Sequence, residues 1–479
     1  MRPERRIRSW HASTLSFGVR GLTAALSAIA ILVVVLYPVL GPSLDSHGAM
    51  SASGRRNADG ARDRSGSDPL AGAGPSGPST PTTTTAAVTA GSPAAPPSSK
   101  ASVATVGAAP TTTTSTTSGQ AVPAGIIGAS GDHLTLNGQI YRFTGVNAYE
   151  IATDWGINAG CGADVTTAQL DQFFSSLRPN SLVRFWAFQG SMATNVNTGQ
   201  IDWGPLDRVF AAAAAYGQRL IPVLTDQGGT CDGNHWQDPS WYSGGFEQVF
   251  DDPAGTDGVN LTPLSYWSYL QAIVNRYKDS PALGMWEPIS EAEASTCSAQ
   301  YEPQDCSGNQ TCPNEAAAAQ ALRSFFDTVG AEIHSLDPAH LVENGLLGSG
   351  QCGTSGTDYQ YVSASPGVDV LSYHDYYDAS DAIGGDQWNG LGVRLAQAAA
   401  LDKPIIGGEA GIVAGAGTGC LSPAQRGTDM STKLEAQLQA GSSGVLVWNW
   451  VPTLTQPCSY DVAPGDPLLS ALAGDPLQG

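Results

Sequence analysis

The stretch that decides the fold is Lys403-Pro404-Ile405-Ile406-Gly407-Gly408-Glu409. It is a short apolar run that ends in an acidic residue. Two longer segments flank it, 391–401 and 422–440, and both are amphipathic or Ala-rich enough to form helices. A short strand between two helices is the repeating unit of a parallel sheet, because each crossover helix returns the chain to the same end of the sheet.

Working outward, the same alternation recurs from about Gly125 onward. Strands are predicted at 141–147, 181–187, 219–225, 283–289, 341–344, 368–373, 404–408 and 444–448. Helices are predicted between them at 166–177, 206–216, 266–277, 314–336, 391–401 and 422–440, with poorly marked candidates at 358–363 and 466–472. Asp337-Pro338 predicts the end of the fourth helix, because proline cannot continue it.

This pattern predicts an α/β fold, a (β/α)₈ TIM barrel with enlarged loops, over residues 125–479. A doubly wound open sheet is the alternative. Such a sheet usually carries a Gly-rich phosphate loop after its first strand. Here the first strand ends in Gly145-Val146-Asn147-Ala148-Tyr149, which lacks that motif.

The amino-terminal part has a different composition. Five arginines precede an apolar run from Gly21 to about Leu40, so residues 1–41 are predicted to be a signal anchor, with a cleaved signal peptide as the alternative. Residues 42–124 are rich in Ser, Thr, Pro, Ala and Gly, which predicts a disordered linker that holds the barrel away from a membrane or wall. The protein is therefore expected to be extracellular, either secreted or tethered.

Charge and cysteine content narrow the function. Asp and Glu total 43 against 22 Lys and Arg, and ten of these basic residues precede Gly125. So acidic a barrel is not expected to bind nucleic acid, since phosphate contacts need Lys and Arg. The eight cysteines all follow residue 125 at irregular spacing without a C-x-x-C pair, which favours disulfide-stapled loops over a zinc site.

Catalytic residues of a barrel lie at the carboxyl ends of its strands. The predicted strand ends carry Asn147, Tyr149, Arg184, Trp186, Asp226, Gln227, Ser290, Glu291, His374, Tyr376, Glu409, Trp448 and Trp450. Two carboxyl groups are what glycoside hydrolysis requires, one to protonate the leaving oxygen and one to attack or support the anomeric centre. Aromatic faces can stack on sugar rings, so this set indicates an enzyme acting on carbohydrate.

Six stretches in order then resemble the clan of retaining barrel glycosidases, most closely the endo-β-1,4-mannanases of glycoside hydrolase family five. The likeness covers roughly residues 137–450. The stretches are Asn137-Gly138 with 141–147, Val183-Arg184-Phe185-Trp186-Ala187-Phe188, 277–282 with Trp286-Glu287-Pro288-Ile289-Ser290-Glu291, Val370-Leu371-Ser372-Tyr373-His374-Asp375-Tyr376, 403–409 and Gly444-Val445-Leu446-Val447-Trp448-Asn449-Trp450.

The resemblance implies roles for seven of the strand-end residues. Glu409 would be the nucleophile and Glu291 the acid and then the base. Arg184 and Tyr376 would hold the nucleophile ionised and aimed. His374 would line the catalytic subsite beside the acid/base. Trp448 would lie beneath the sugar in the −1 subsite, and Trp186 would line a neighbouring subsite.

The chain departs from the family pattern in two places. Ser290 stands where the family has an Asn that contacts the sugar 2-hydroxyl, so that contact is lost, water-mediated or supplied by another residue. Asp226-Gln227 ends the third strand, where relatives often carry a His or an Asn-rich run. Glu287 and Glu293 compete with Glu291 for the acid/base role, and Glu287 matches a Glu of the family that is usually structural.

We therefore expect a retaining glycoside hydrolase that cleaves β-1,4-linked polysaccharide, most closely an endo-β-1,4-mannanase, with a monomeric catalytic domain and no cofactor or metal. Acidic loops such as 226–232 lack the regular spacing of an EF-hand calcium site. A β-1,4-glucanase or an exo-β-mannosidase is the alternative within the same chemistry. A non-catalytic carbohydrate-binding wall protein on a degenerate barrel is the alternative of another class.

Overall fold

The computed structural model describes residues 125–474, except 230–235, 251–258, 298–305 and 307–309. The predicted signal segment at 1–41 and linker at 42–124 lie outside the described residues. No helix within the described ranges is both long and apolar enough to cross a membrane.

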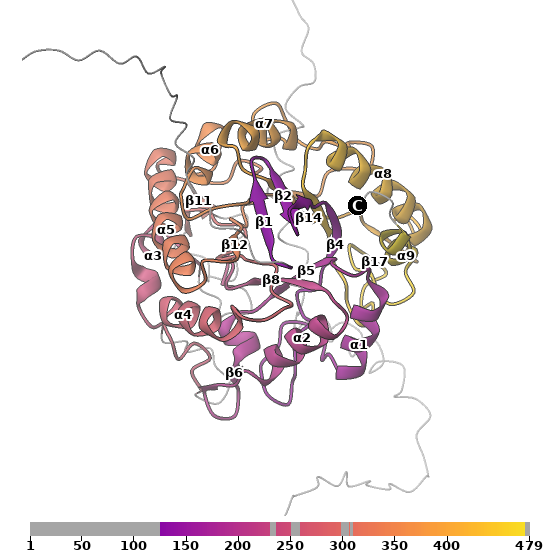
Figure 1. The fold of residues 1–479 in the computed structure, drawn as a ribbon, viewed down its shortest axis with the longest axis horizontal. Helices are drawn as coiled ribbons and strands as arrows, with labels where there is room; N and C mark the ends of the chain where they lie inside the picture. Colours follow the sequence, from indigo (N-terminus) through magenta and orange to yellow (C-terminus); the bar gives the residue numbers. More distant parts are fainter. Residues whose placement is uncertain (1–124, 230–235, 251–258, 298–305, 307–309, 475–479) are drawn as a thin grey trace, which may run out of the picture. The chain divides into compact units, whose positions relative to one another are not determined.

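Eight parallel strands close into a barrel within the described residues, as predicted (Figure 1). They are β4 (Phe143–Asn147), β5 (Leu182–Trp186), β8 (Arg219–Val223), β9 (Met285–Trp286), β12 (Leu341–Val342), β13 (Leu371–Asp375), β14 (Ile405–Ala410) and β16 (Gly444–Val447). Six of them form one sheet in the order β13-β14-β16-β4-β5-β8. The pair β9 and β12 fills the gap through parallel bridges Leu220↔Leu283 and Glu343↔Val370.

The helices surround this ring of strands (Figure 1). The crossover helices are α1 (Thr167–Ser176), α2 (Gly204–Ala215), α4 (Tyr266–Tyr277), α5 (Glu315–Leu336), α6 (Thr357–Ser363), α7 (Leu391–Leu401), α8 (Pro423–Ala440) and α9 (Pro467–Gly474). Each lies within a few residues of its prediction, and α5 ends directly before Asp337-Pro338. Thr166 caps α1 through a reciprocal capping box with Gln169, which fixes where that helix begins.

An amino-terminal antiparallel unit that the sequence did not predict closes one end of the barrel. It consists of β1 (Ile127–Ser130), β2 (His133–Leu136) and β3 (Gln139–Ile140). Its Ile127 and Leu134 are fully buried in one cluster with Phe143 and Leu182, the first residues of β4 and β5. The unit therefore seals the amino-terminal end of the strands and leaves the carboxyl end for the site.

The enlarged loops contain short elements of their own. These are β6 (Thr194–Asn195) with β7 (Gln200–Ile201), α3 (Pro239–Tyr242), β10 (Thr296–Cys297) with β11 (Gln310–Thr311), and β15 (Ala414–Gly415) with β17 (Cys458–Ser459). The predicted disulfide staples are present as Cys297–Cys306, Cys312–Cys352 and Cys420–Cys458. Cys161 is also disulfide-bonded. Disulfides within loops restrict the unfolded chain and are typical of exported proteins.

Gly145 shows how tightly the barrel is packed. A Cβ at this position would lie 2.1 Å from Leu182 O and 2.7 Å from Leu446 Cδ2. The first of these is backbone, which cannot move aside without displacing β5.

We predict that Gly145→Ala lowers the free energy of unfolding by roughly 1–3 kcal/mol, because overpacking a barrel core forces strand displacement. Urea denaturation measures it. Gly427→Ala is the matched control: it lies inside α8, and the atoms nearest its Cβ are 3.6 Å away or more. Alanine is favoured over glycine there by about 1 kcal/mol. Equal stability of the two variants would contradict the packing argument.

Candidate active site

The site is built around Arg184, which β5 presents at the carboxyl end of the barrel. Its side chain is 1% exposed. The guanidinium donates to both oxygens of Glu287, each at 2.6 Å, and to Glu409 Oε1 at 2.6 Å. It also donates to Asn147 Oδ1 at 3.0 Å and to Ser290 Oγ at 2.7 Å. These five contacts use all five N–H donors of an arginine, so its position is fully determined.

Glu409 lies near the carboxyl end of β14, and it is 5% exposed. Its Oε1 accepts from Arg184, and its Oε2 accepts from the Tyr376 hydroxyl at 2.5 Å. Burial raises the pKa of Glu409, while His374, Arg184 and Tyr376 act in the opposite direction. The two predicted partners of Glu409 therefore occupy both of its oxygens and favour its ionised form.

Glu291 follows β9 and its backbone is unusual. It has a φ of +56°, a left-handed conformation that non-glycine residues rarely adopt. Its N–H donates to Gly345 O at 2.6 Å, which ties the residue to the end of β12. Gly345 is itself left-handed, and a Cβ there would lie 2.1 Å from Ile289 O. A strained backbone held by close contacts is typical of functional positions.

His374 lies between the two predicted catalytic carboxylates. Its Nδ1 is 2.7 Å from Glu291 Oε1 and 3.5 Å from Glu409 Oε2. Burial lowers the pKa of His374 to about 4, so the imidazole is neutral at neutral pH. Oxygens of Glu291 and Glu409 lie within 4.8 Å of each other. Retaining glycosidases hold their carboxyl groups about 5–5.5 Å apart and inverting ones roughly 6.5–9.5 Å apart, so the approach fits the retaining geometry.

The two carboxyl groups differ in their partners. Burial raises the pKa of Glu291 to about 7, with Arg184 lowering it and Glu287 raising it. The Glu291 carboxyl group contacts the neutral His374, whereas Glu409 has the Arg184 cation directly on one oxygen. Glu291 is also the more accessible, with a side chain 16% exposed against 6% for Glu409. A proton is therefore held more readily by Glu291.

An aromatic wall borders this pair. Trp448 follows β16, is half-buried, and stacks on Tyr149 with ring centroids 5.5 Å apart and planes at 9°. Trp186 is only 4% exposed, because Phe188 stacks against it at 4.8 Å and Tyr149 packs at 4.7 Å. Trp448 is thus the more exposed tryptophan of this wall, and its place beneath the −1 sugar stays a prediction. Trp186 supports the wall from behind, and its predicted subsite role stays a prediction.

The segment that carries His374 and Tyr376 is anchored from outside the barrel. Asp375, between them in β13, forms a buried ion pair with Lys433 of α8 at 2.9 Å and accepts from Gln437 at 2.6 Å. Lys433 also donates to Tyr377 O at 2.8 Å. Side chains alternate along a strand, so fixing Asp375 outward fixes its two neighbours toward the site.

The residues at the predicted departures also have structural partners. Ser290 is 4% exposed and accepts from Arg184. Gln227 is 6% exposed, and its side chain accepts from Glu293 N at 2.8 Å and donates to Gln237 O at 2.8 Å. Gln227 thus braces the loop that follows Glu291. Trp236, farther along the loop after Gln227, is 9% exposed, and its indole donates to Ser295 O.

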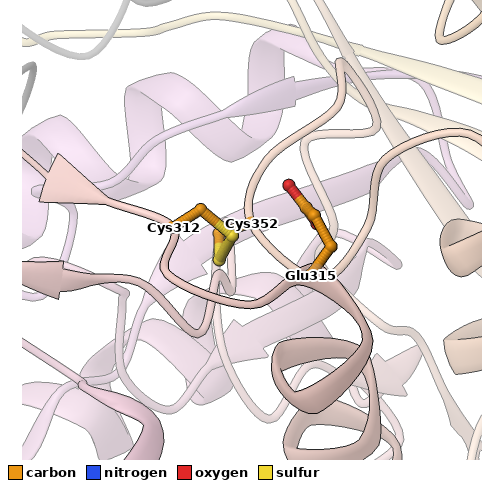
Figure 2. A group of neighbouring side chains, drawn as sticks. All are labelled: Cys312, Glu315 and Cys352. Atoms are coloured by element: carbon orange, nitrogen blue, oxygen red, sulfur yellow. A yellow bond between two sulfur atoms is a disulfide. The ribbon is translucent and has the colours of Figure 1, made fainter.

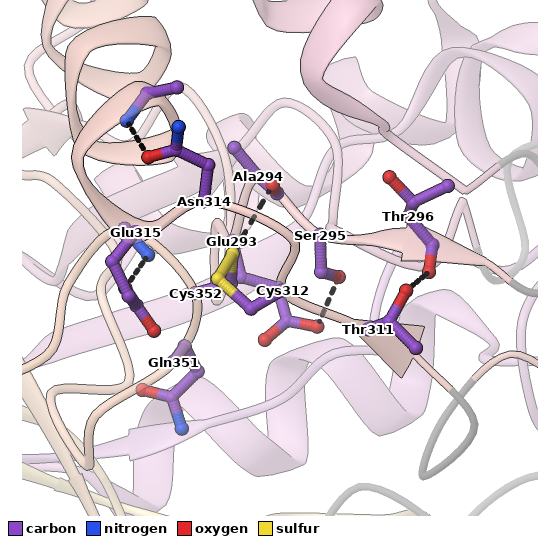
Figure 3. The surroundings of a disulfide bond; sticks show 12 residues. Glu293, Ala294, Ser295, Thr296, Thr311, Cys312, Asn314, Glu315, Gln351 and Cys352 are labelled. Atoms are coloured by element: carbon purple, nitrogen blue, oxygen red, sulfur yellow. Dashed lines mark hydrogen bonds between the residues drawn. A yellow bond between two sulfur atoms is a disulfide. The ribbon is translucent and has the colours of Figure 1, made fainter.

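A disulfide lies on the same loop (Figure 3). The Ala294 N–H donates to the carbonyl oxygen of Cys352 at 3.1 Å. The disulfide Cys312–Cys352 then links this loop to the residues just before α5. Glu293 lies beside it, 6% exposed, and its carboxylate accepts from Ser295 Oγ at 2.9 Å. Glu287 and Glu293 are therefore both buried in supporting contacts, which leaves Glu291 as the carboxyl group of this region at the open site.

In the described ranges, two clusters of side chains bring together atoms that could bind a metal ion. One is Cys312, Glu315 and Cys352, but the two sulfurs are bonded to each other, and Glu315 accepts from Gly353 N (Figure 2). The other is Glu291, His374 and Glu409. An ion there would compete with Arg184 and Tyr376 for Glu409, so the donor set fits a hydrogen-bonded acid pair better than a metal centre.

Sequence reasoning missed two exposed tryptophans. Trp155 is 61% exposed on the loop after β4, and Trp388 is 66% exposed on the loop after β13. Both loops follow barrel strands and so belong to the active-site end. Neither residue lies in a periodic segment, so hydrophobic periodicity does not mark it as part of the site. Listing the Trp residues in the loops that follow the predicted strands would have found both.

Comparison with known proteins supports the predicted resemblance. No family model matches the sequence. The chain is 25% identical over 355 residues to a probable mannan endo-1,4-beta-mannosidase F of Aspergillus flavus, covering 67% of this chain and 66% of that protein. It is 25% identical over 367 residues to a probable mannan endo-1,4-beta-mannosidase A-2 of Aspergillus terreus, covering 69% and 79%.

The chain resembles the endo-β-mannanases, as its motifs predicted. It nevertheless spans just under two thirds of the length of the first of these relatives. Among solved structures, the endo-1,4-beta-mannanase from Rhizomucor miehei matches with a TM-score of 0.50 at 20% identity, covering 73% of this chain and 97% of that one. This structural likeness agrees with the barrel fold.

The buried acids predict how stability depends on pH. Burial raises the pKa of both Glu291 and Glu293 to about 7 from 4.5. The folded state then binds their protons more tightly than the unfolded state, so their contribution is complete below about pH 4.5 and is lost as the pH rises through 7. We expect the thermal midpoint to fall across this window. Calorimetry of Glu291→Gln should give a shallower fall, and the exposed Glu435→Gln should leave the wild-type slope.

Proposed function

We propose that the protein is a retaining endo-β-1,4-mannanase. The observation that carries this proposal is the pairing of Glu291 and Glu409 across His374, with oxygens within 4.8 Å and only Glu409 directly bonded to Arg184. The similarity to mannan endo-1,4-beta-mannosidases supports the choice of substrate. The exposed Trp155 and Trp388 support a polymer, since each offers a ring face beyond the central pair.

In the first step, Glu409 attacks the anomeric carbon of the sugar above Trp448. The bond from that carbon to the leaving oxygen breaks, and Glu291 gives its proton to this oxygen. The result is a sugar covalently bound to Glu409 and a released chain with a free hydroxyl. Arg184 and Tyr376 hold both Glu409 oxygens in the free enzyme, so the attacking oxygen needs no further reorientation.

In the second step, Glu291 is ionised and takes a proton from water. The water oxygen bonds to the anomeric carbon, and the bond to Glu409 breaks, which restores both carboxyl groups and the original anomeric configuration. This double use of Glu291 requires a pKa near the working pH, and burial raises it to about 7. Every step uses side chains of this chain, with no cofactor.

We also propose that the enzyme works outside the cell, tethered by the apolar run within residues 1–41 through the linker 42–124. The disulfides of the barrel support an oxidising compartment. Cell fractionation with and without a wash that strips peripheral proteins tests the tether. Activity released wholly to the medium would favour a cleaved signal peptide.

Substrate and nucleophile are tested together by assaying the full chain on mannan, glucomannan, cellulose and xylan. We expect the highest rate of reducing-end release on mannan and cleavage within the polymer. Glu409→Ala should lose activity on every substrate. Glu291→Ala should lose about 10²–10⁴-fold, because general acid catalysis contributes this much, with a smaller loss on aryl mannosides whose leaving group needs no proton.

Glu435→Gln, an exposed acid on α8, is the control and should keep wild-type rates. Activity that survives in Glu409→Ala would overturn the nucleophile assignment. Preference for cellulose would favour a β-1,4-glucanase, and release of single mannose units from chain ends would favour an exo-β-mannosidase. Binding without cleavage on all four substrates would favour a carbohydrate-binding protein.

The acid role of Glu291 also predicts the pH profile of catalysis. Its pKa is raised to about 7, and loss of this proton removes the general acid. We therefore expect kcat/KM on mannan to decline on the alkaline side with a midpoint near pH 7. An aryl mannoside with a good leaving group should show a weaker decline. A profile flat to pH 9 on both substrates would contradict the assignment.

A further inference from the structure

Three buried polar groups beside the catalytic pair make no hydrogen bond of good geometry within the described residues, although the Glu343 carboxyl group lies close to both Ser372 and Glu287. They are the carboxyl oxygens of Glu343, the hydroxyl of Ser372 and Nε2 of His374. Their residues are 1%, 0% and 1% exposed. Buried polar groups are almost always hydrogen-bonded, so three such groups together indicate an arrangement with a role.

These groups lie close together inside the barrel. Ser372 and His374 are two residues apart in β13 and point to the same side. A Cβ on Gly408 would lie 2.3 Å from Ser372 Oγ and 2.9 Å from His374 Nε2, so both groups lie close against the same glycine of β14. Glu343 comes from the neighbouring strand end, where it bridges to Val370, and the Ser372 hydroxyl adjoins its carboxyl group.

We propose that Glu343 and Ser372 are positioning residues that fix the tautomer of His374. A protonated Glu343 carboxyl group donates to Ser372 Oγ, and the Ser372 hydroxyl donates to His374 Nε2, directly or across one bound water. Nε2 is then an acceptor, and the single ring proton of the neutral imidazole must lie on Nδ1. The chain thus runs from Glu343 to the acid/base with each of its donors facing an acceptor.

The proposal rests on the proposed function, because it explains how Glu291 keeps its proton available. His374 Nδ1 lies 2.7 Å from Glu291 Oε1. When Nδ1 carries the proton it donates to Oε1, so the acidic proton of Glu291 is left on Oε2. In the other tautomer, Nδ1 would accept the proton of Glu291 on Oε1 and hold it away from the leaving oxygen.

The surroundings of Glu343 favour the protonated form. Glu287 faces it from β9, Arg184 from β5 and Tyr359 from α6. Arg184 is the cation of this group, and all its donors are already used by other residues. Burial and then Glu287 raise the pKa of Glu343 well above its usual range, which Arg184 and Ser372 only partly oppose. An ionised Glu343 would instead attract a proton to Nε2 and reverse the tautomer.

The test is the ¹⁵N spectrum of histidine-labelled full-length protein, with His374→Ala to assign the resonances. We expect one protonated Nδ1 and one unprotonated Nε2 for His374 in the wild type. Ser372→Ala and Glu343→Leu should move the two shifts toward each other, because both tautomers become populated. Glu343→Gln should restore the wild-type pattern, since its amide can still donate. Ser442→Ala, a buried serine bonded to Gly444 O, is the matched control and should change nothing.

Kinetics give a second readout. Ser372→Ala should lower kcat on the order of 10-fold with KM unchanged, less than the roughly 10²–10⁴-fold of losing the general acid itself. A wild-type spectrum with the proton on Nε2, or a Ser372→Ala spectrum identical to the wild type, would overturn the proposal. The spectrum is read in the free enzyme. If the protein cleaved none of the polysaccharides, the proposed function would be overturned. The tautomer assignment would still be decided by the ¹⁵N spectrum alone.

Discussion

The interaction on which the site depends is the buried guanidinium of Arg184, shared by Glu287 and Glu409. A buried ion pair is costly unless its geometry is good and its remaining groups are satisfied, and here every N–H of the arginine has an acceptor. These acceptors come from β4, β14 and the end of β9. One side chain therefore sets the relative positions of three strand ends, and the closed barrel holds it in return.

This constraint changes the meaning of Ser290. In the family that the motifs resemble, an Asn stands there and contacts substrate, so a serine suggests a lost contact. In the structure the hydroxyl of Ser290 is buried and completes the arginine shell at 2.7 Å. The residue thus belongs to the support of Glu409. Under the proposed function, contact with the sugar 2-hydroxyl would then come from groups at the open face, where the half-buried Trp448 and Tyr376 lie.

Periodicity and strand-end logic predicted the barrel and gathered Arg184, Glu291, His374, Tyr376 and Glu409 at one end. This worked because parallel strands put all their carboxyl ends together, so each strand is informative by itself. Contacts between elements gave no such local signal. Nothing near Asp375 indicates Lys433 as its partner, and Glu343 occupies a strand end like any buried acid. The antiparallel unit at 127–140 was missed because its apolar residues pack only against the amino-terminal end of the barrel, a contact that the local sequence does not indicate.

The roles proposed for the two carboxyl groups follow from their neighbours more than from how deeply they are buried. Burial raises both pKa values, so desolvation alone would make the groups equivalent. What separates them is that a permanent cation touches Glu409, whereas a neutral imidazole touches Glu291. A cation favours the carboxylate at every pH. A neutral imidazole can either donate to Glu291 or accept its proton, depending on which ring nitrogen carries hydrogen. The groups around the other nitrogen of His374 therefore influence where the Glu291 proton lies.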